Sequence, residues 1–229
     1  YHLTGVRDTK PEITISDATV EKLEAESKYI IIEGIGGIGK SMFLTHLFLS
    51  SAQNSTYSSV VPLFLSLKDY KDTTDNVVDF IWKSICEYDS KISKKDIIEA
   101  LQNKELILLL DGFDEIQTSV RESFQSDLEA FIKSYNGNTI IMTSRPIYDS
   151  FVSFSKFSVF DIKPLTKKQA LALIDKLEFW DEIAKKSFME ALDNKLYYSH
   201  LQFASNPLLL TIMLMTYSSF GEVPAKMHV

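Results

Sequence analysis

Residues 29–41 read YIIIEGIGGIGKS, and this stretch decides how the rest of the sequence is interpreted. Four of the chain's eight glycines lie within residues 34–39, directly after an apolar run and directly before Lys40 and Ser41. Only residues without a Cβ atom let a backbone wrap closely enough for its N–H groups to converge on a phosphate chain. The spacing G-x-x-x-x-G-K-S therefore predicts a phosphate-binding loop between a strand and a helix.

The residue types in this loop suit the phosphates of a nucleotide. A helix starting at Lys40 would add the partial positive charge of its first turn. The Lys40 ammonium would reach the β- and γ-phosphates, and the Ser41 hydroxyl would be a ligand of Mg²⁺. A glycine-rich turn without a ligand is the alternative, but the flanking strand and helix favour binding of ATP or ADP. The expected nucleotide contacts are Gly34, Ile35, Gly36, Gly37, Ile38, Gly39, Lys40, Ser41 and Met42.

A second motif, LILLLDGFDE, occupies residues 106–115. Its apolar run predicts a buried strand, and Asp111 at the end of that strand is expected to hold Mg²⁺ through its carboxylate. The next residue is Gly112, which cannot supply a base for water. Asp114 and Glu115 are therefore the candidate catalytic acids, with a helix-capping role as the alternative.

A third motif, IIMTSRP, occupies residues 140–146 and predicts a buried strand that stops at a Ser-Arg-Pro turn. Arg145 would then lie at the same sheet edge as Gly34 and Asp111. A cation there can stabilise charge in phosphoryl transfer and distinguish a nucleotide that has a γ-phosphate from one that lacks it. The alternative is an ordinary surface arginine, but the chain has only three arginines, which favours the functional interpretation.

Composition narrows the class of protein. The 229 residues are 45% hydrophobic and 24% charged, as expected for a globular chain. The net charge of −7 argues against a nucleic-acid surface, and no apolar run is long enough for a membrane span. The lone Cys86 excludes a disulfide framework, and no signal peptide is visible, so we expect a cytoplasmic location. Because the chain starts at Tyr1 and ends at Val229 without a stopping structure, we interpret it as a piece of a longer polypeptide.

Strands alternate with helices along much of the sequence, which predicts an α/β fold with a parallel sheet covered on both faces. After KPLT at 163–166 the pattern becomes entirely helical, and Thr166 with Gln169 has the spacing of a capping box. We expect a lead-in at 1–27, an α/β core at 28–163 and a helical subdomain at 164–229. The expected strands are 29–33, 60–67, 106–110, 139–143 and 157–162, and the expected helices are 40–49, 77–88, 120–135, 167–179, 181–192 and 207–217.

Taken together, the glycine loop, hhhhDGhDE and TSRP resemble the NACHT NTPases of the STAND class. The resemblance extends from about residue 21 to the C-terminus and includes PLFLSLKDY, DIKPLTKKQA and NPLLLTIM. It implies a three-layer P-loop NTPase fold whose five-stranded parallel sheet has the order 5-1-4-3-2, followed by a helical lid. It also places Pro207 against adenine, with the lead-in at 1–7 closing the other side of the base. Lys68 stands where many members have arginine.

The resemblance implies the function of the whole protein as well. The segment would be a slow Mg²⁺-dependent ATPase switch whose ATP or ADP state controls opening and homo-oligomerisation. A winged-helix region after Val229 and effector and sensor domains would complete the polypeptide, with a role in microbial immune or anti-phage defence. A module that holds ADP without hydrolysis is the main alternative. A kinase is disfavoured because residues 164–229 contain no arginine, and a GTPase because no N-K-x-D stretch occurs.

Overall fold

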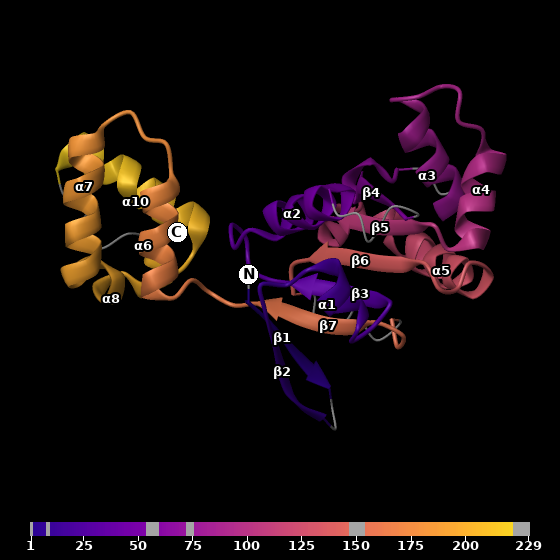
Figure 1. Ribbon diagram of the computed structural model, residues 1–229, viewed down its shortest axis with the longest axis horizontal. Coiled ribbons are helices and arrows are strands. Elements are labelled where there is room, and N and C mark those ends of the chain that lie inside the picture. Colours follow the sequence, from indigo (N-terminus) through magenta and orange to yellow (C-terminus); the bar gives the residue numbers. More distant parts are fainter. Residues whose placement is uncertain (1, 8–9, 54–59, 72–75, 147–153, 222–229) are drawn as a thin grey trace. The chain divides into compact units, whose positions relative to one another are not determined.

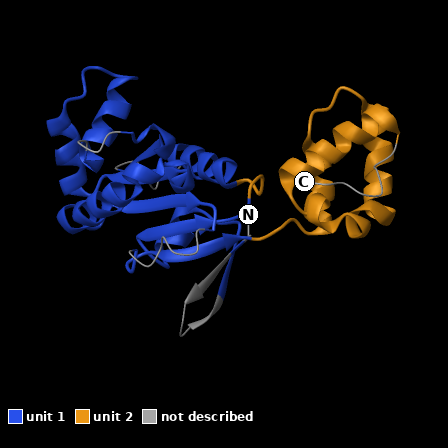
Figure 2. Cartoon of the chain, turned by 180° about the vertical axis from the view of Figure 1, so that it is seen from behind, with its two compact units in different colours: residues 1–35, 40–162 blue, residues 36–39, 163–229 orange. Residues whose placement is uncertain are grey.

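The computed structural model describes residues 2–7, 10–53, 60–71, 76–146 and 154–221 (Figure 1). The chain divides into two compact units (Figure 2). The first contains residues 1–35 and 40–162, and the second contains residues 36–39 and 163–229. The sequence predicted a boundary between core and helical subdomain after residue 163, whereas the two units divide after residue 162. The predicted lead-in, residues 1–27, is grouped with the first unit.

The first unit is built on one sheet of seven strands in the order β2-β1-β7-β3-β6-β5-β4. Strands β7, β3, β6, β5 and β4 are mutually parallel, which confirms the predicted α/β fold with five parallel strands. Numbered along the chain, these five read 5-1-4-3-2 across the sheet. The strands are β1 (His2–Arg7), β2 (Lys10–Ser16), β3 (Tyr29–Glu33), β4 (Val61–Ser66), β5 (Leu106–Asp111), β6 (Thr139–Ser144) and β7 (Ser158–Ile162).

The hairpin β1–β2 was not predicted, so an expectation of only five strands was incomplete. Strand β1 pairs antiparallel with β2 on one side and with β7 on the other, where Leu3 lies opposite Ile162. An isolated hairpin is marginally stable, and this one depends on the edge of β7, which is about 155 residues away in sequence. Tyr1 lies outside the described residues, so the predicted contact of the lead-in with a base stays a prediction.

Helices cover both faces of the sheet because the parallel strands bury both of their faces. On one face, Leu106, Leu108 and Leu110 of β5 join a core formed with α3, α4 and α5. Ile107 and Leu109 point to the other face and are also buried, and α2 packs there against β4, β5 and β6. The elements are α1 (Val20–Glu24), α2 (Lys40–Gln53), α3 (Val77–Cys86), α4 (Lys94–Asn103), α5 (Thr118–Ser134) and the 3₁₀ turns η2 (Leu67–Asp69) and η3 (Phe113–Glu115).

Two of these helices, α1 and α4, were not predicted, and α2 continues past the expected residue 49. The α4 segment was missed although it carries a capping box, formed by Ser93 and Asp96. Residues 50–53 belong to α2, and residues 54–59 lie outside the described part of the chain.

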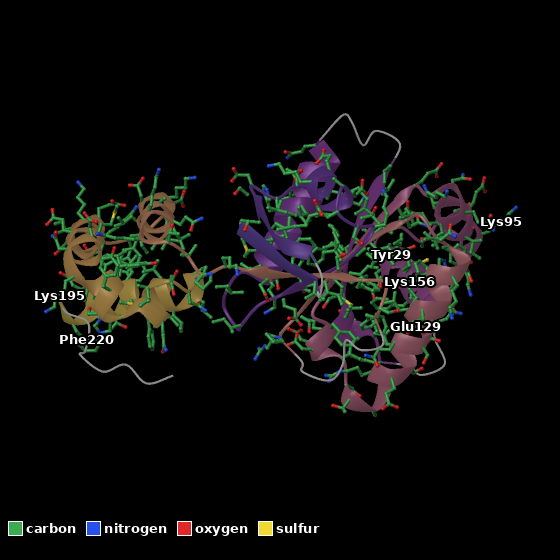
Figure 3. All side chains as sticks on the ribbon, turned by 90° about the horizontal axis from the view of Figure 1, so that it is seen from below. Tyr29, Lys95, Glu129, Lys156, Lys195 and Phe220 are labelled. Carbon is green, nitrogen blue, oxygen red and sulfur yellow. The ribbon has the colours of Figure 1, made fainter. Side chains whose placement is uncertain are left out.

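The second unit is helical, and its side chains meet between the helices (Figure 3). The predicted capping box of Thr166 and Gln169 is confirmed at the start of α6. Lys185 is buried, and its ammonium donates to the carbonyls of Asp175 and Leu177 at the end of α6. No helix in the described ranges has the length and apolar character needed to cross a membrane. The elements are α6 (Lys167–Lys176), α7 (Glu182–Ala191), the π-helix η4 (Leu192–Leu196), α8 (Tyr197–Ser199), α9 (Leu201–Ala204) and α10 (Pro207–Phe220).

Candidate functional site

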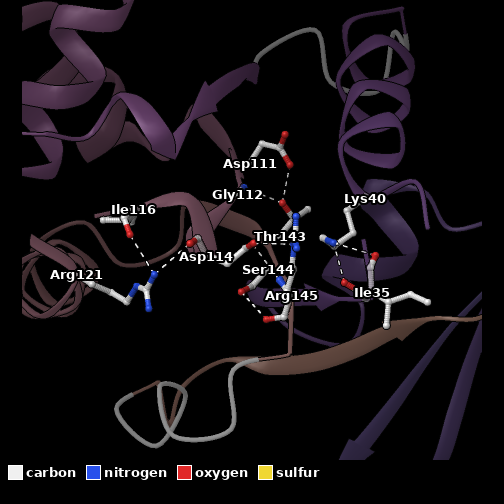
Figure 4. A network of polar contacts seen from close by, with 11 residues as sticks. Ile35, Lys40, Asp111, Gly112, Asp114, Ile116, Arg121, Thr143, Ser144 and Arg145 are labelled. Atoms are coloured by element: carbon white, nitrogen blue, oxygen red, sulfur yellow. Dashed lines mark hydrogen bonds and ion pairs between the residues drawn. The ribbon is translucent and has the colours of Figure 1, made fainter. Parts of the chain in front are cut away.

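The glycine loop joins the end of β3 to the first residue of α2, which is Lys40. Gly37 and Gly39 have φ values of 75° and 101°, which side chains with a Cβ rarely adopt. The Lys40 ammonium turns back over the loop and donates to the Gly34 carbonyl at 2.7 Å and the Ile35 carbonyl at 3.2 Å (Figure 4). The loop therefore has the left-handed glycines that the motif predicts, and the Lys40 ammonium is held on the carbonyls at its start.

Burial and nearby charges shift the pKa of Lys40. Burial lowers the pKa of the Lys40 ammonium, and the Asp114 carboxylate opposes that effect more than any other neighbour. Removal from water disfavours the charged form of the Lys40 ammonium, whereas a bound anion would favour it. Burial also raises the pKa of Glu33, the last residue of β3, with the Asp161 carboxylate adding to the effect.

The carboxyl end of β6 links the glycine loop to the DGFDE segment. The Ser144 carbonyl accepts a hydrogen bond from the Gly34 N–H at 3.3 Å. The Thr143 hydroxyl donates to the Asp111 carboxylate at 2.6 Å and accepts from the Gly112 N–H at 2.9 Å. Thr143 is fully buried, and these two bonds satisfy its hydroxyl. It orients the predicted magnesium ligand, a role that its place in TSRP did not reveal.

Gly112 has a physical reason to be glycine. Its φ of 81° lies in the left-handed region, and a Cβ added to it would come within 3.1 Å of the Glu115 Cδ atom. The Glu115 side chain thus fills the space that a side chain on residue 112 would take. Glu115 is exposed, so its carboxylate is open to water close to Asp111 in sequence. This placement keeps Glu115 as a candidate base.

Arg145 and Asp114 pair with each other. The Arg145 backbone N–H donates to one Asp114 carboxylate oxygen at 3.0 Å, and the Arg145 Nε lies 3.2 Å from the other. The Asp114 side chain is only 16% exposed, whereas that of Arg145 is 63% exposed. Both predicted residues are therefore at this edge of the sheet, but both Asp114 oxygens are engaged. Asp114 is better placed to orient Arg145 than to take a proton.

Arg121 on α5 is a further residue of this site that the sequence analysis did not single out. Its Nη2 donates to the carbonyls of Asp114 and Ile116 at 3.0 Å each, and its guanidinium lies 5.7 Å from the Phe113 ring centroid. Within the described residues its buried Nε has no hydrogen-bond partner. Arg121 thereby holds the backbone of the turn that carries Asp114 and Glu115.

The remaining predicted residues are Ser41, Met42 and Pro207. Ser41 and Met42 are exposed in the first turn of α2, and Pro207 is the half-buried first residue of α10, capped by Asn206. The described residues hold no group of three His, Cys, Asp or Glu side chains able to enclose a metal ion. Mg²⁺ at a phosphate site needs no such cage, because phosphates and waters supply most ligands. The hydroxyl of Ser41 and the oriented carboxylate of Asp111 are donors of the right chemistry.

Replacement of Arg121 should destabilise the protein through this turn. Arg121→Met keeps an apolar side chain but leaves the Asp114 and Ile116 carbonyls without their charged donor. We expect a loss of about 2–3 kcal/mol in the free energy of unfolding, which corresponds to roughly 5–10 °C in melting temperature. Denaturation by urea measures the first and differential scanning calorimetry the second.

Two further variants control this measurement. Arg121→Lys can still donate to a carbonyl and should recover part of the loss, whereas Glu122→Met, at an exposed position next to Arg121 on α5, should stay within about 0.5 kcal/mol of the wild type. An Arg121→Met protein as stable as the Glu122→Met protein would contradict the bracing role.

Comparison with solved structures shows the fold. The chain is similar to the Walker-type ATPase PABY2304 of Pyrococcus abyssi, with 10% identity over 89% of this chain and 66% of that chain and a TM-score of 0.51. It is also similar to AMPPCP-bound DnaA from Aquifex aeolicus (17% identity, 86% and 58% coverage, TM-score 0.48) and to a RuvB variant from Thermotoga maritima (12% identity, 87% and 61% coverage, TM-score 0.44). The chain spans about 58–66% of the length of the first structures that it matches.

A family model identifies the chain more specifically. No curated protein sequence matched it. The model of the NACHT domain matches residues 28–178, a range that contains the glycine loop, Asp111, Asp114, Glu115 and Arg145. Since this match covers more than half of the chain, the protein belongs to the NACHT domain family.

Proposed function

We propose that this chain is a nucleotide-binding module that binds ATP and ADP with Mg²⁺ and hydrolyses ATP slowly. The observation that carries the proposal is the position of Lys40, whose ammonium is held on the carbonyls of the glycine loop. Asp111 is the last residue of β5 and Arg145 directly follows β6, and both strands are parallel to β3 in the same sheet. A loop for phosphates, a carboxylate for a metal and a largely exposed cation thus lie at one sheet edge.

When bound, Mg²⁺ neutralises charge on the phosphate oxygens during phosphoryl transfer. Ser41 and Asp111 are the residues that would hold it. Thr143 contributes by fixing the Asp111 carboxylate, since a metal ligand whose orientation is already set loses less entropy on binding. Lys40 would exchange its two carbonyl acceptors for phosphate oxygens.

Glu115 and Asp114 of the DGFDE segment would have different roles in hydrolysis. Glu115, exposed and folded against Gly112, would position or deprotonate the attacking water. Asp114 would hold Arg145, whose side chain stays largely exposed and can contact a γ-phosphate. Because ADP lacks that phosphate, Arg145 would favour ATP, and only such a differential contact lets a nucleotide shift a two-state equilibrium.

The wider proposal is that the module is the switch of a larger STAND-type signalling protein. Membership of the NACHT family supports it, with the helical unit acting as a lid over the base, Pro207 against adenine, and oligomers forming in the ATP state. A cytoplasmic role in microbial immune or anti-phage defence is proposed on the same ground. Light scattering of the full-length protein should show a larger assembly with ATP than with ADP, and equal sizes would contradict the switch.

Removal of the Lys40 ammonium should abolish tight nucleotide binding. In the wild type, ADP or Mg-ATP at a hundredfold excess over Kd adds about 2.7 kcal/mol of stability. For a chain of this size that corresponds to a melting shift of roughly 5–10 °C. Lys40→Met should show little or no shift when scanned with either nucleotide, because the phosphates lose their cationic partner.

Lys28→Met is a matched control, because Lys28 is also a partly exposed lysine but precedes the amino end of β3, where it pairs with Glu24. That variant should keep the full nucleotide shift. A wild-type protein that shows no shift and carries no nucleotide after purification would overturn the proposed function.

The proposed division among Glu115, Asp114 and Arg145 can be read from steady-state kinetics and nucleotide titrations. Glu115→Gln should lower kcat by about a hundredfold, the lower end for loss of a general base, with ATP affinity nearly unchanged. Asp114→Asn should lower kcat far less, because both of its oxygens already serve Arg145. Arg145→Ala should weaken ATP binding more than ADP binding.

Multiple-turnover phosphate release by the wild type separates an ATPase from the alternative module that holds ADP without hydrolysis. An Asp114→Asn protein as slow as Glu115→Gln would show that the roles are wrongly divided. An equal loss of ATP and ADP affinity in Arg145→Ala would remove Arg145 from γ-phosphate recognition.

A further inference from the structure

The tip of the glycine loop, residues 36–39, belongs to the same compact unit as the start of α10. Asn206 is only 1% exposed, and both polar atoms of its side-chain amide form hydrogen bonds here. Its Nδ2 donates to the Gly36 carbonyl at 2.9 Å, and its Oδ1 accepts from the N–H groups of Leu208 and Leu209 at 3.1 and 3.2 Å. Asn206 is therefore both the cap of α10 and a donor to the loop.

A second bond reaches the next peptide unit of the loop. The Leu208 N–H also donates to the Gly37 carbonyl at 3.3 Å. The peptide bonds after Gly36 and Gly37 are trans and planar, so each carbonyl points opposite to the N–H of the following residue. With both carbonyls bonded to the start of α10, the N–H groups of Gly37 and Ile38 are turned away from α10. These two donors belong to the set that a phosphate-binding loop presents.

The space at Gly37 fits the same interpretation. A Cβ atom on Gly37 would lie 2.8 Å from the Leu208 Cβ and 2.9 Å from the Asn206 Oδ1, both of which are too close. The position therefore excludes a side chain because of α10, in addition to its φ of 75°. Gly37 therefore packs closely against residues 206–208, although about 170 residues separate them in the sequence.

We infer that Asn206 is a positioning residue for phosphate binding, which sets the N–H groups of Gly37 and Ile38 by holding the Gly36 carbonyl. The inference rests on the proposed function and adds a residue to it. Pro207, proposed for the base, directly follows Asn206, so one turn of α10 would serve both ends of the nucleotide. Any movement that separates α10 from the loop would then release the phosphate donors.

The test uses ligands that report on different parts of the site. Pyrophosphate contacts only the phosphate loop, adenosine only the base region, and ADP both. Asn206→Ser keeps a good helix cap and removes the amide that reaches Gly36. We expect its affinity for ADP and for pyrophosphate to fall by about three- to tenfold, as for one lost hydrogen bond. Adenosine affinity should stay unchanged. Calorimetry, or displacement of a fluorescent ADP, measures all three.

Two variants make the result specific. Asn206→Thr also caps a helix, also lacks the Nδ2 donor and adds no charge, so it should weaken pyrophosphate binding even if the serine variant folds poorly. Thr166→Ala removes the cap of α6 in the same unit and should lower the melting temperature while leaving all three affinities within about twofold.

Unchanged pyrophosphate affinity in both Asn206 variants would overturn the inference, including the case in which only ADP binding weakens, since the fault would then lie at the base. A wild-type protein that binds neither ADP nor pyrophosphate would instead reject the proposed function, and the inference with it.

Discussion

The candidate site depends on the hydrogen bonds made at the carboxyl end of β6. Strand β6 is hydrogen-bonded to β3 on one side and to β5 on the other. Its Ser144 carbonyl holds the first N–H of the glycine loop, and its Thr143 hydroxyl holds Asp111 and the Gly112 N–H. Every residue of β6 is buried, so its polar groups need partners within the protein. The same requirement that stabilises the sheet thus fixes the relative positions of loop and carboxylate.

The acids of the site are held by backbone conformation as much as by side chains. The left-handed Gly112 starts a turn closed by the bonds from the Glu115 N–H to Gly112 and from the Ile116 N–H to Phe113. Arg121 then bridges two carbonyls of this turn from α5. A partly buried cation that donates to carbonyls keeps the turn rigid without neutralising Asp114 or Glu115. The carboxylates consequently remain available to a cation at the sheet edge or to water.

This NACHT site contains two cations close together although the chain as a whole is acidic. The net charge is −7, yet two cations, Lys40 and Arg145, stand among Asp111, Asp114 and Glu115. In the described structure Lys40 is bonded to neutral carbonyls, and Arg145 is paired with Asp114 but remains largely exposed. Phosphate oxygens can replace the Gly34 and Ile35 carbonyls as acceptors for Lys40, and the start of α2 favours an anion. The site is therefore arranged for an anion although the protein is acidic.

The sequence by itself determined the features that depend on neighbouring residues. The apolar runs gave the five parallel strands, Thr166 and Gln169 gave the capped start of α6, and the glycine spacing gave a loop with left-handed residues, because strand period, capping and φ preference act over a few positions. The hairpin β1–β2 was not predicted because its strands depend on pairing with the distant β7, whereas α4 was missed although its capping box is present in the sequence. Only the tertiary structure decided that Thr143 orients Asp111, that Arg145 pairs with Asp114, that Arg121 braces their turn and that Asn206 meets Gly36. Most of these pairs are some 30 to 170 residues apart in the sequence. Arg121 is close to its turn in the sequence, but it reaches the turn through a side-chain conformation that no local pattern specifies. Such contacts arise from strand pairing and helix packing, and the spacing of the residues in the sequence does not predict them.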